Sequence, residues 1–167
     1  VAVVAAQLSS WGNPSSLHAA GRAARKSVEE SRERDADALG ARPSEVVFTS
    51  GGTEADNLAV KGLFWSRRSA DPARLRVIVC AVEHHAVLEA VQWLGEAQGA
   101  TVEWLPVDGH GRVDTGALRS ALAEDAASVS LVTVMWANNE VGTLQPVHEL
   151  VAAARPHGIP VHSDAVQ

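Results

Sequence analysis

Residues 76–98 read RVIVCAVEHHAVLEAVQWLGEAQ, and their pattern changes from that of a strand to that of a helix. Residues 76–81 form a short apolar run rich in β-branched side chains, which is typical of a buried strand. In residues 86–98 the apolar side chains recur with the spacing of one helical face instead. The stretch therefore predicts one strand followed directly by one helix.

The same alternation continues in both directions from this stretch. Further strands are expected at residues 46–49, 101–105, 129–135 and 159–162, and further helices at 54–67, 115–123 and 147–155. Strands that alternate with helices at this spacing favour a mostly parallel sheet with helices on both faces. We therefore predict an α/β fold, with this sheet forming a domain of residues 41–167.

Residues 1–40 differ from the rest of the chain. The segment 17–39 is rich in Ala, Arg and Glu, contains no proline and runs into Gly40, a natural helix stop. We expect one long, mostly solvated helix here, and we assign residues 1–40 to a separate N-terminal segment. Because the chain starts with Val1 and stops directly after an apolar run, we expect it to be a piece of a longer protein.

The composition argues against several classes of protein. The chain has 14 Lys and Arg residues against 20 Asp and Glu, which gives a formal net charge of −6, whereas nucleic-acid-binding surfaces gather basic side chains. No apolar run approaches the roughly 20 residues of a membrane-spanning helix, and the opening residues lack the basic region of a signal peptide. We expect neither a nucleic-acid nor a membrane partner.

The single cysteine, Cys80, lies within the apolar run VIVCAV. A lone cysteine excludes an internal disulfide and a cysteine-rich metal site, which fits a reducing cytoplasm. Its apolar surroundings indicate a buried small hydrophobe rather than a nucleophile. We expect a cytoplasmic protein and assign no chemistry to this residue.

Ligands of open α/β sheets bind at the carboxyl ends of the strands, so we look for polar residues there. Ser50, Gly51, Gly52 and Thr53 follow the first predicted strand and precede a helix, whose free N–H groups and dipole favour an anion. The segment has neither the dinucleotide fingerprint nor the lysine of a P-loop. A phosphate site and a plain strand-to-helix turn capped by Thr53 both explain it.

Histidines and amides follow two other predicted strands. His84 and His85 come after the second strand, where one histidine is usually structural or exposed, and two adjacent ones do not both face one site. The remaining histidines are scattered, so we expect no metal site. Asn138 and Asn139 follow the fourth strand, where an Asx turn closed by Gly142 and a ligand contact are equally good explanations.

Asp164 ends the fifth predicted strand, where a buried carboxylate could face a cationic ring nitrogen. Together the strand ends offer a phosphate cradle, an imidazole, an amide and a carboxylate. This set suits a phosphorylated aromatic cofactor with a basic ring nitrogen. Pyridoxal 5′-phosphate (PLP) is the obvious candidate, because its pyridinium nitrogen needs an acidic partner to act as an electron sink. Spacing alone does not name the cofactor.

Five motifs in this order resemble those of the cysteine desulfurases of the NifS/IscS type. They are GNPSSLH (12–18), ARPSEVVFTSGGTEADNLAVKG (41–62), EHHAVLEAV (83–91), WANNEVGTLQP (136–146) and HSDAVQ (162–167). These enzymes belong to the class V aminotransferase family of fold-type I PLP enzymes. The resemblance implies that the chain is the N-terminal half of such an enzyme's large domain together with neighbouring segments.

The resemblance also implies roles for particular residues. Gly52 and Thr53 would bind the cofactor phosphate through backbone N–H groups and the Thr hydroxyl. His84 would stack on the pyridine ring and, as the predicted catalytic residue of this chain, assist proton transfers.

Three further residues would hold the ring of the cofactor. Asp164 would pair with the pyridinium nitrogen, and Asn139 and Gln167 would contact the phenolic oxygen. The motifs that carry the Schiff-base lysine and the catalytic cysteine of such enzymes should lie beyond Gln167. Lys26 and Lys61 lie in helices, where solvated faces are expected. The 167-residue chain alone is therefore expected to be inactive.

For the intact protein, the resemblance implies conversion of L-cysteine to L-alanine, with the sulfur held as an enzyme persulfide. Sulfur would pass to scaffold or acceptor proteins for iron–sulfur clusters and thiolated nucleotides, and the enzyme would be a homodimer. A selenocysteine lyase or another class V aminotransferase or lyase is the nearest alternative. A further alternative is a non-catalytic interaction domain, although such a domain would have no need for the complete set of site residues.

Overall fold

The computed structural model describes residues 11–167, and their packing divides the chain into two compact units after Phe48. The predicted domains divide after residue 40 instead. The second unit runs from Thr49 to Gln167 and contains the whole sheet. We describe each unit by itself.

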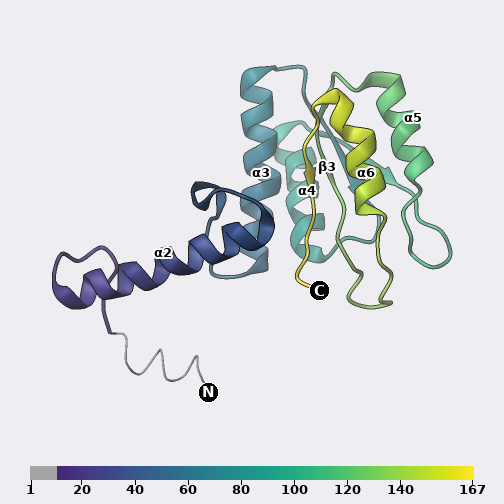
Figure 1. The fold of residues 1–167 in the computed structure, drawn as a ribbon. Helices are drawn as coiled ribbons and strands as arrows, with labels where there is room; N and C mark the ends of the chain where they lie inside the picture. The colour runs from purple at the N-terminus through teal and green to yellow at the C-terminus, as the bar shows by residue number, and fades with distance from the viewer. Residues whose placement is uncertain (1–10) are drawn as a thin grey trace. The chain divides into compact units, whose positions relative to one another are not determined.

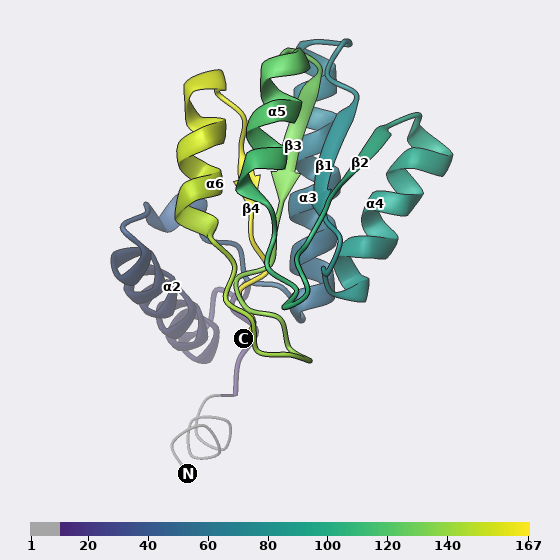
Figure 2. The same ribbon diagram turned by 90° about the vertical axis from the view of Figure 1, so that its right-hand side faces the viewer.

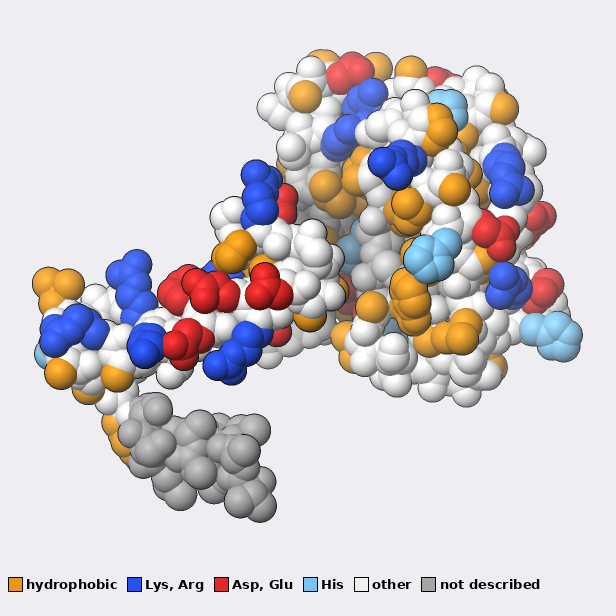
Figure 3. Space-filling view, in the orientation of Figure 1, with side chains coloured by type: hydrophobic (Ala, Val, Ile, Leu, Met, Phe, Trp, Pro, Cys, Tyr) orange, Lys and Arg blue, Asp and Glu red, His pale blue; other side chains and the backbone are white. Residues whose placement is uncertain are grey.

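The described part of the first unit is built on one long helix, α2 (Ala19–Leu39), followed by the short 3₁₀ helix η1 (Pro43–Glu45) (Figure 1). The Nδ1 atom of His18 accepts a hydrogen bond from the N–H of Gly21 and caps the start of α2. Gly40 ends the helix in the left-handed conformation, at φ 65°. Acidic and basic side chains lie along its surface (Figure 3). The prediction of a long, mostly solvated helix that stops at Gly40 is confirmed.

The second unit is a four-stranded sheet in which all neighbouring strands are parallel, in the order β2–β1–β3–β4. The strands are β1 (Arg76–Cys80), β2 (Thr101–Leu105), β3 (Val129–Thr133) and β4 (Val161–His162). The helices are α3 (Gly52–Ala70), α4 (His85–Gln98), α5 (Thr115–Asp125), α6 (Val147–Ala154) and the 3₁₀ helix η2 (Arg155–His157). No described helix is both long and apolar enough to cross a membrane.

Helices cover both faces of the sheet, as Figure 2 shows. Val77 and Val79 of β1 pack with residues of α3 and α4, whereas Ile78 and Cys80 pack with residues of α5 and α6. This alternation follows from the two-residue period of a strand. The predicted α/β class, with a mostly parallel sheet and helices on both faces, is confirmed. Cys80 is fully buried, as expected, and burial raises the pKa of its thiol to about 11.

The order of the strands creates a crevice at one edge of the sheet. The chain leaves the carboxyl end of β1 toward α4 on one face, and it leaves the neighbouring β3 toward α6 on the other face. Connections that diverge from adjacent parallel strands leave an opening between them, which is where open α/β sheets bind ligands. The topology therefore places the candidate site between the ends of β1 and β3.

The first predicted strand, residues 46–49, is wrong. The segment forms no ladder with any described strand, and the side chains of Val47 and Phe48 are 62% and 47% exposed. A strand requires hydrogen bonds to a neighbour as well as β-branched residues, and the four strands of this sheet pair only with one another. The glycine pair therefore follows an unpaired segment, and α3 begins at the second glycine, Gly52.

Candidate cofactor site

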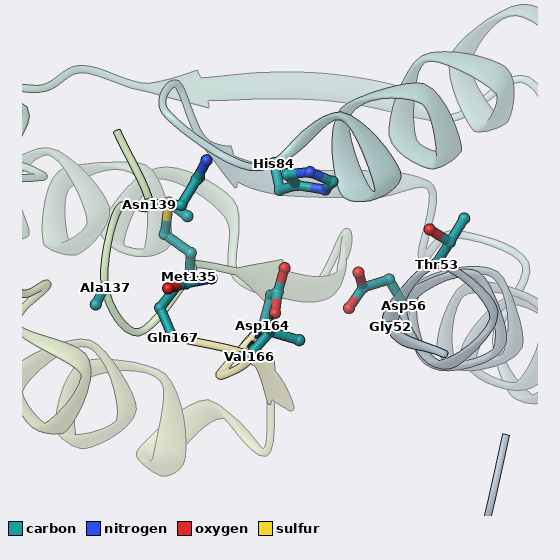
Figure 4. A pocket seen from close by; sticks show the side chains of 10 residues that line it. All are labelled: Gly52, Thr53, Asp56, His84, Met135, Ala137, Asn139, Asp164, Val166 and Gln167. Carbon is teal, nitrogen blue, oxygen red and sulfur yellow. Dashed lines mark hydrogen bonds between the residues drawn. The ribbon is translucent and has the colours of Figure 1, made fainter. Parts of the chain in front are cut away.

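The crevice contains a cavity of about 260 Å³ that is lined by all six predicted site residues (Figure 4). These residues come from the start of α3, the end of β1, the loop after β3 and the segment after β4. They are Gly52, Thr53, His84, Asn139, Asp164 and Gln167, and the cavity is completed by Asp56, Met135, Ala137 and Val166. The structure thus brings the predicted set together, while the cofactor contacts assigned to its members stay predictions.

The start of α3 is open. Gly51 is its N-cap residue, and no side chain caps the helix. The interpretation of Thr53 as a capping residue is therefore wrong, because the helix begins at Gly52, two residues earlier than a cap at Thr53 requires. The Glu54 carboxylate instead accepts hydrogen bonds from the hydroxyl and the N–H of Ser50, at 2.6 and 2.7 Å, and these bonds lower its pKa. The N–H groups of Gly52 and Thr53 remain available to an anion.

Space rather than backbone strain explains the second residue of the glycine pair, Gly52, whereas a Cβ atom on Gly51 would meet no other atom within 4 Å. Gly51 has an extended backbone with φ 168°, which any residue adopts, and Gly52 is helical. A Cβ atom on Gly52 would lie 3.3 Å from Cγ2 of Val166, on the wall of the cavity. The missing side chain therefore keeps the first turn of α3 accessible from the cavity.

His84 has two functions in the structure. Its Nδ1 atom accepts a hydrogen bond of 3.2 Å from the N–H of Ala86 and caps α4, while its ring lines the cavity. Because Nδ1 is an acceptor here, the neutral imidazole carries its proton on Nε2. His85 is the first residue of α4 and is not among the residues that line this cavity. Of the two adjacent histidines, only His84 therefore lines this cavity, while both line a neighbouring pocket.

The two asparagines after β3 divide the roles that the sequence left open. The Oδ1 atom of Asn138 accepts the N–H groups of Glu140 and Val141, both at 2.9 Å, and its Nδ2 atom donates to the carbonyl of Val82. Asn138 thus forms the Asx turn, and Gly142 follows with φ 75°. Asn139 is left exposed and lines the cavity.

Asp164 is held at the end of β4. Its Oδ1 atom accepts the N–H of Val166 at 3.1 Å, and its backbone carbonyl accepts the N–H of Trp136 at 2.7 Å. The second contact extends the pairing between the β3 and β4 segments beyond the two strands. The half-buried carboxylate and the exposed Gln167 are therefore presented to the cavity next to the end of β3.

Sequence reasoning missed Asp56, which is only 5% exposed and lines the cavity from α3. Its Oδ1 atom lies 3.4 Å from Nε2 of His162, whose Nδ1 atom is 2.9 Å from the hydroxyl oxygen of Thr133. Burial raises the pKa of Asp56 to about 6, Asp164 raises it further, and His84 opposes the change. Burial lowers the pKa of His162, and Asp164 opposes this effect.

Glu83, next to the catalytic candidate His84, was also missed. Its side chain is 6% exposed, and neither carboxyl oxygen has a hydrogen-bond partner among the described residues. Burial raises the pKa of Glu83 to about 8, the backbone of Met135 opposes the change, and Asp164 and Asp56 add to it. Burial thus favours the neutral form of this carboxyl group. A charged residue directly after an apolar strand was the available signal.

Neither lysine of the chain lines the cavity. Lys26 lies 3.6 Å from Glu30 on the exposed surface of α2. Lys61 is not only solvated, because it also contacts a side chain: its Nζ atom lies 4.6 Å from the ring centroid of Trp93 on α4. Among the lining residues, only histidine can carry a positive charge.

The parallel sheet and the polar cavity at its carboxyl edge define an α/β protein with a candidate ligand site at a topological switch point. The chain belongs to the aminotransferase class V family, whose family model matches residues 2–167. It is 58% identical to an IscS-like cysteine desulfurase of Mycobacterium tuberculosis, over 93% of this chain and 39% of the relative. The resemblance read from the five motifs is thereby confirmed.

Two solved structures have the same fold. A NifS-like protein superposes with a TM-score of 0.85 at 36% identity, over 98% of this chain and 44% of that protein. The protein SspA, in complex with cysteine, gives a TM-score of 0.85 at 36% identity, over 97% of this chain and 45% of that protein. The chain thus spans less than half the length of these relatives.

Proposed function

We propose that the full-length protein containing this chain is a PLP-dependent cysteine desulfurase. The observation that carries the proposal is the cavity in which an open helix start, the His84 ring and the Asp164 carboxylate meet. Similarity to proteins named cysteine desulfurase and to a structure that holds cysteine supports L-cysteine as the substrate. The products would be L-alanine and a persulfide on an enzyme cysteine.

The residues present fit PLP. The uncapped first turn of α3 and the Thr53 hydroxyl supply donors for a phosphate, and the absence of a side chain on Gly52 leaves room for it. Asp164 supplies an acceptor for a protonated ring nitrogen, and the ring of His84 lies on the cavity wall as a stacking surface. The amides of Asn139 and Gln167 can donate to the phenolic oxygen.

When bound, PLP would act as the electron sink that weakens bonds at the α-carbon of the amino acid substrate. The residues of this chain orient it and manage charge and protons around it. Asp164 would keep the ring nitrogen protonated, because an adjacent carboxylate stabilises the positive charge. His84 is held by the Ala86 N–H through Nδ1, so Nε2 is the atom at which it can hold or release a proton.

The remaining features of the proposal concern the intact protein. The lysine that attaches the cofactor and the cysteine that takes the sulfur would lie outside these 167 residues, so the isolated chain would be inactive. The intact enzyme would be a cytoplasmic homodimer that passes sulfur to scaffold or acceptor proteins for iron–sulfur clusters or thiolation. The family and the single buried cysteine support this assignment.

The proposal is tested with the protein expressed from its complete gene. We expect PLP-dependent release of alanine and sulfide from L-cysteine, and we expect Asp164→Asn to lower turnover by about ten- to a hundredfold through loss of a charge-assisted hydrogen bond. Asp71→Asn, at the exposed end of α3, is the matched control. Turnover of another amino acid or of selenocysteine in place of cysteine would refute the desulfurase assignment, and unchanged turnover in Asp164→Asn would refute the role of that residue.

A further inference from the structure

Asp56 occupies an unusual position for a carboxylate. It lies on the buried side of α3, in line with Val60 and Phe64, which are fully buried at intervals of four residues. Gly52, in the open first turn, lies one turn earlier on the same side. Figure 4 shows the carboxylates of Asp56 and Asp164 facing the same part of the cavity, with the His84 ring beside them. A buried carboxylate in this place requires a partner.

That partner is His162, which links three elements of the second unit. Its Nε2 atom lies 3.4 Å from Asp56 of α3, its Nδ1 atom lies 2.9 Å from the Thr133 hydroxyl of β3, and it belongs to β4 itself. An ionised carboxylate only accepts hydrogen bonds, so a neutral His162 ring suits this contact with its proton on Nε2, 3.4 Å from Asp56, and with Nδ1 free to accept from the Thr133 hydroxyl. Asp164 follows two residues later, so this contact also holds the segment that carries it.

The charges around the cavity are not balanced. Two carboxyl groups line it, and none of its lining residues is Lys or Arg. One of the two carboxylates, Asp164, matches the positive charge of a ring nitrogen. An ionised Asp56 would then be a like charge one helical turn from the phosphate at Gly52, and like charges in a site of low dielectric oppose binding.

We propose that Asp56 and His162 take up one proton between them when a phosphorylated cofactor occupies the cavity, so that Asp164 remains the only carboxylate facing it whose negative charge the protein does not neutralise. Asp56 is thus a positioning residue that sets the charge of the site through His162. The proton comes from bulk water and makes the pair electrically neutral. This inference rests on the proposed function, because it needs an anionic ligand at the start of α3.

The surrounding groups are consistent with uptake at this pair. Burial raises the pKa of Asp56 to about 6. The negative charge of a nearby phosphate would raise this pKa further, toward neutral pH. Burial also raises the pKa of Glu83 to about 8, which favours the neutral form of this neighbour. Asp164 raises and His84 lowers the pKa of Asp56. The Asp56–His162 pair combines burial, a close contact between the two side chains and a carboxylate on the cavity wall.

The first test observes the pair directly. The full-length protein, labelled with ¹⁵N-histidine, is titrated with acid with and without pyridoxine 5′-phosphate, a probe that forms no covalent bond with lysine. We expect His162 to carry its proton on Nε2 without the probe. When the probe binds, we expect a rise in the pH at which the Asp56–His162 pair is half titrated, the titration midpoint. An unchanged or lowered midpoint overturns the proposal.

The second test compares dissociation constants of the same probe between pH 5.5 and pH 8. Asp56→Asn is permanently neutral, so wild type should match it at low pH and bind more weakly at high pH. If the titration midpoint rises by one pH unit on binding, the dissociation constant of wild type divided by that of Asp56→Asn should increase by about tenfold from low to high pH. The control Asp71→Asn, at the other end of α3, should keep a constant ratio to wild type.

The outcomes separate this inference from the proposed function. Binding of the probe with a ratio that is flat or falls with pH overturns the role of Asp56 and leaves the desulfurase assignment intact. No binding of the probe refutes the cofactor site itself. Should Asp56→Asn not fold, the midpoint measured in the unmodified protein still decides the question.

Discussion

The helices α3 and α5 both begin at the carboxyl edge of the sheet, but their first turns differ. Asp114 caps α5, because its Oδ1 atom accepts the N–H groups of Gly116 and Ala117 at 2.7 and 3.3 Å. No side chain caps α3. A capped start satisfies its own N–H groups and contributes stability, whereas an open start leaves them to a ligand. The difference separates a helix that only supports the fold from one that can also bind.

The helix α4 combines both properties. His84 caps it through Nδ1, and the same ring lines the cavity. Its two roles can be separated by substitution, because asparagine also accepts a hydrogen bond at an N-cap position but has no aromatic ring. The three helix starts therefore form a series in which stability and cofactor affinity should respond differently to substitution.

The largest effect is expected at the open start. Gly52→Ala places a methyl group on the cavity wall, 3.3 Å from Cγ2 of Val166, and should weaken PLP binding by the full-length protein about ten- to a hundredfold through lost charge-assisted hydrogen bonds. Thermal stability should not fall, since alanine favours a helix more than glycine does. Gly62→Ala, within the same helix and with no atom near the added methyl group, is the control and should leave affinity unchanged. Equal affinities in both variants would contradict the assignment of the phosphate site.

An intermediate effect is expected at His84. Both His84→Ala and His84→Asn remove the ring and should weaken PLP binding by about two- to tenfold, the value of one aromatic contact. Only the alanine variant should also lose the cap of α4, which costs about 1 kcal/mol of unfolding free energy. Chemical denaturation measures the second quantity. If the asparagine variant retains wild-type affinity, the ring does not contact the cofactor.

No effect on PLP binding is expected at the capped start of α5. Asp114→Ala should lower the free energy of unfolding by about 1 kcal/mol, because the N–H groups of Gly116 and Ala117 lose their acceptor. Asp114→Asn should restore most of this loss. The dissociation constant for PLP should be the same in all three proteins, and a change in that constant would show that the two helix starts are not independent.

Most of the fold could be predicted from local patterns, and the main exception is the segment 46–49. The strands β1 to β4 and the helices between them follow the alternation of periods in the sequence. Residues 46–49 have the same composition as a strand but find no neighbour among the described strands, and pairing is not a local property. The predicted strands that begin at residues 129 and 159 are present over shorter ranges, Val129–Thr133 and Val161–His162.

Most residues of the candidate site could be predicted from the sequence, but Asp56 and its partner His162 were not. Gly52, His84, Asn139 and Asp164 follow the predicted segments at the expected edge, and the structure places them around one cavity. Asp56 was missed although it stands in line with Val60 and Phe64, where a charged residue on a buried face is itself a signal. Its partner, His162, could not be inferred from spacing.

The sequence by itself determined the alternation of strands and helices, the parallel sheet, the edge at which ligands bind and the family. These properties depend on periodicity and on short motifs, which are local. Only the tertiary structure decided which of two adjacent residues faces the cavity, as with Asn138 and Asn139, and that α3 begins without a cap. It alone brought Asp56 to His162, because burial and contacts between distant segments arise only when the helices pack on the sheet.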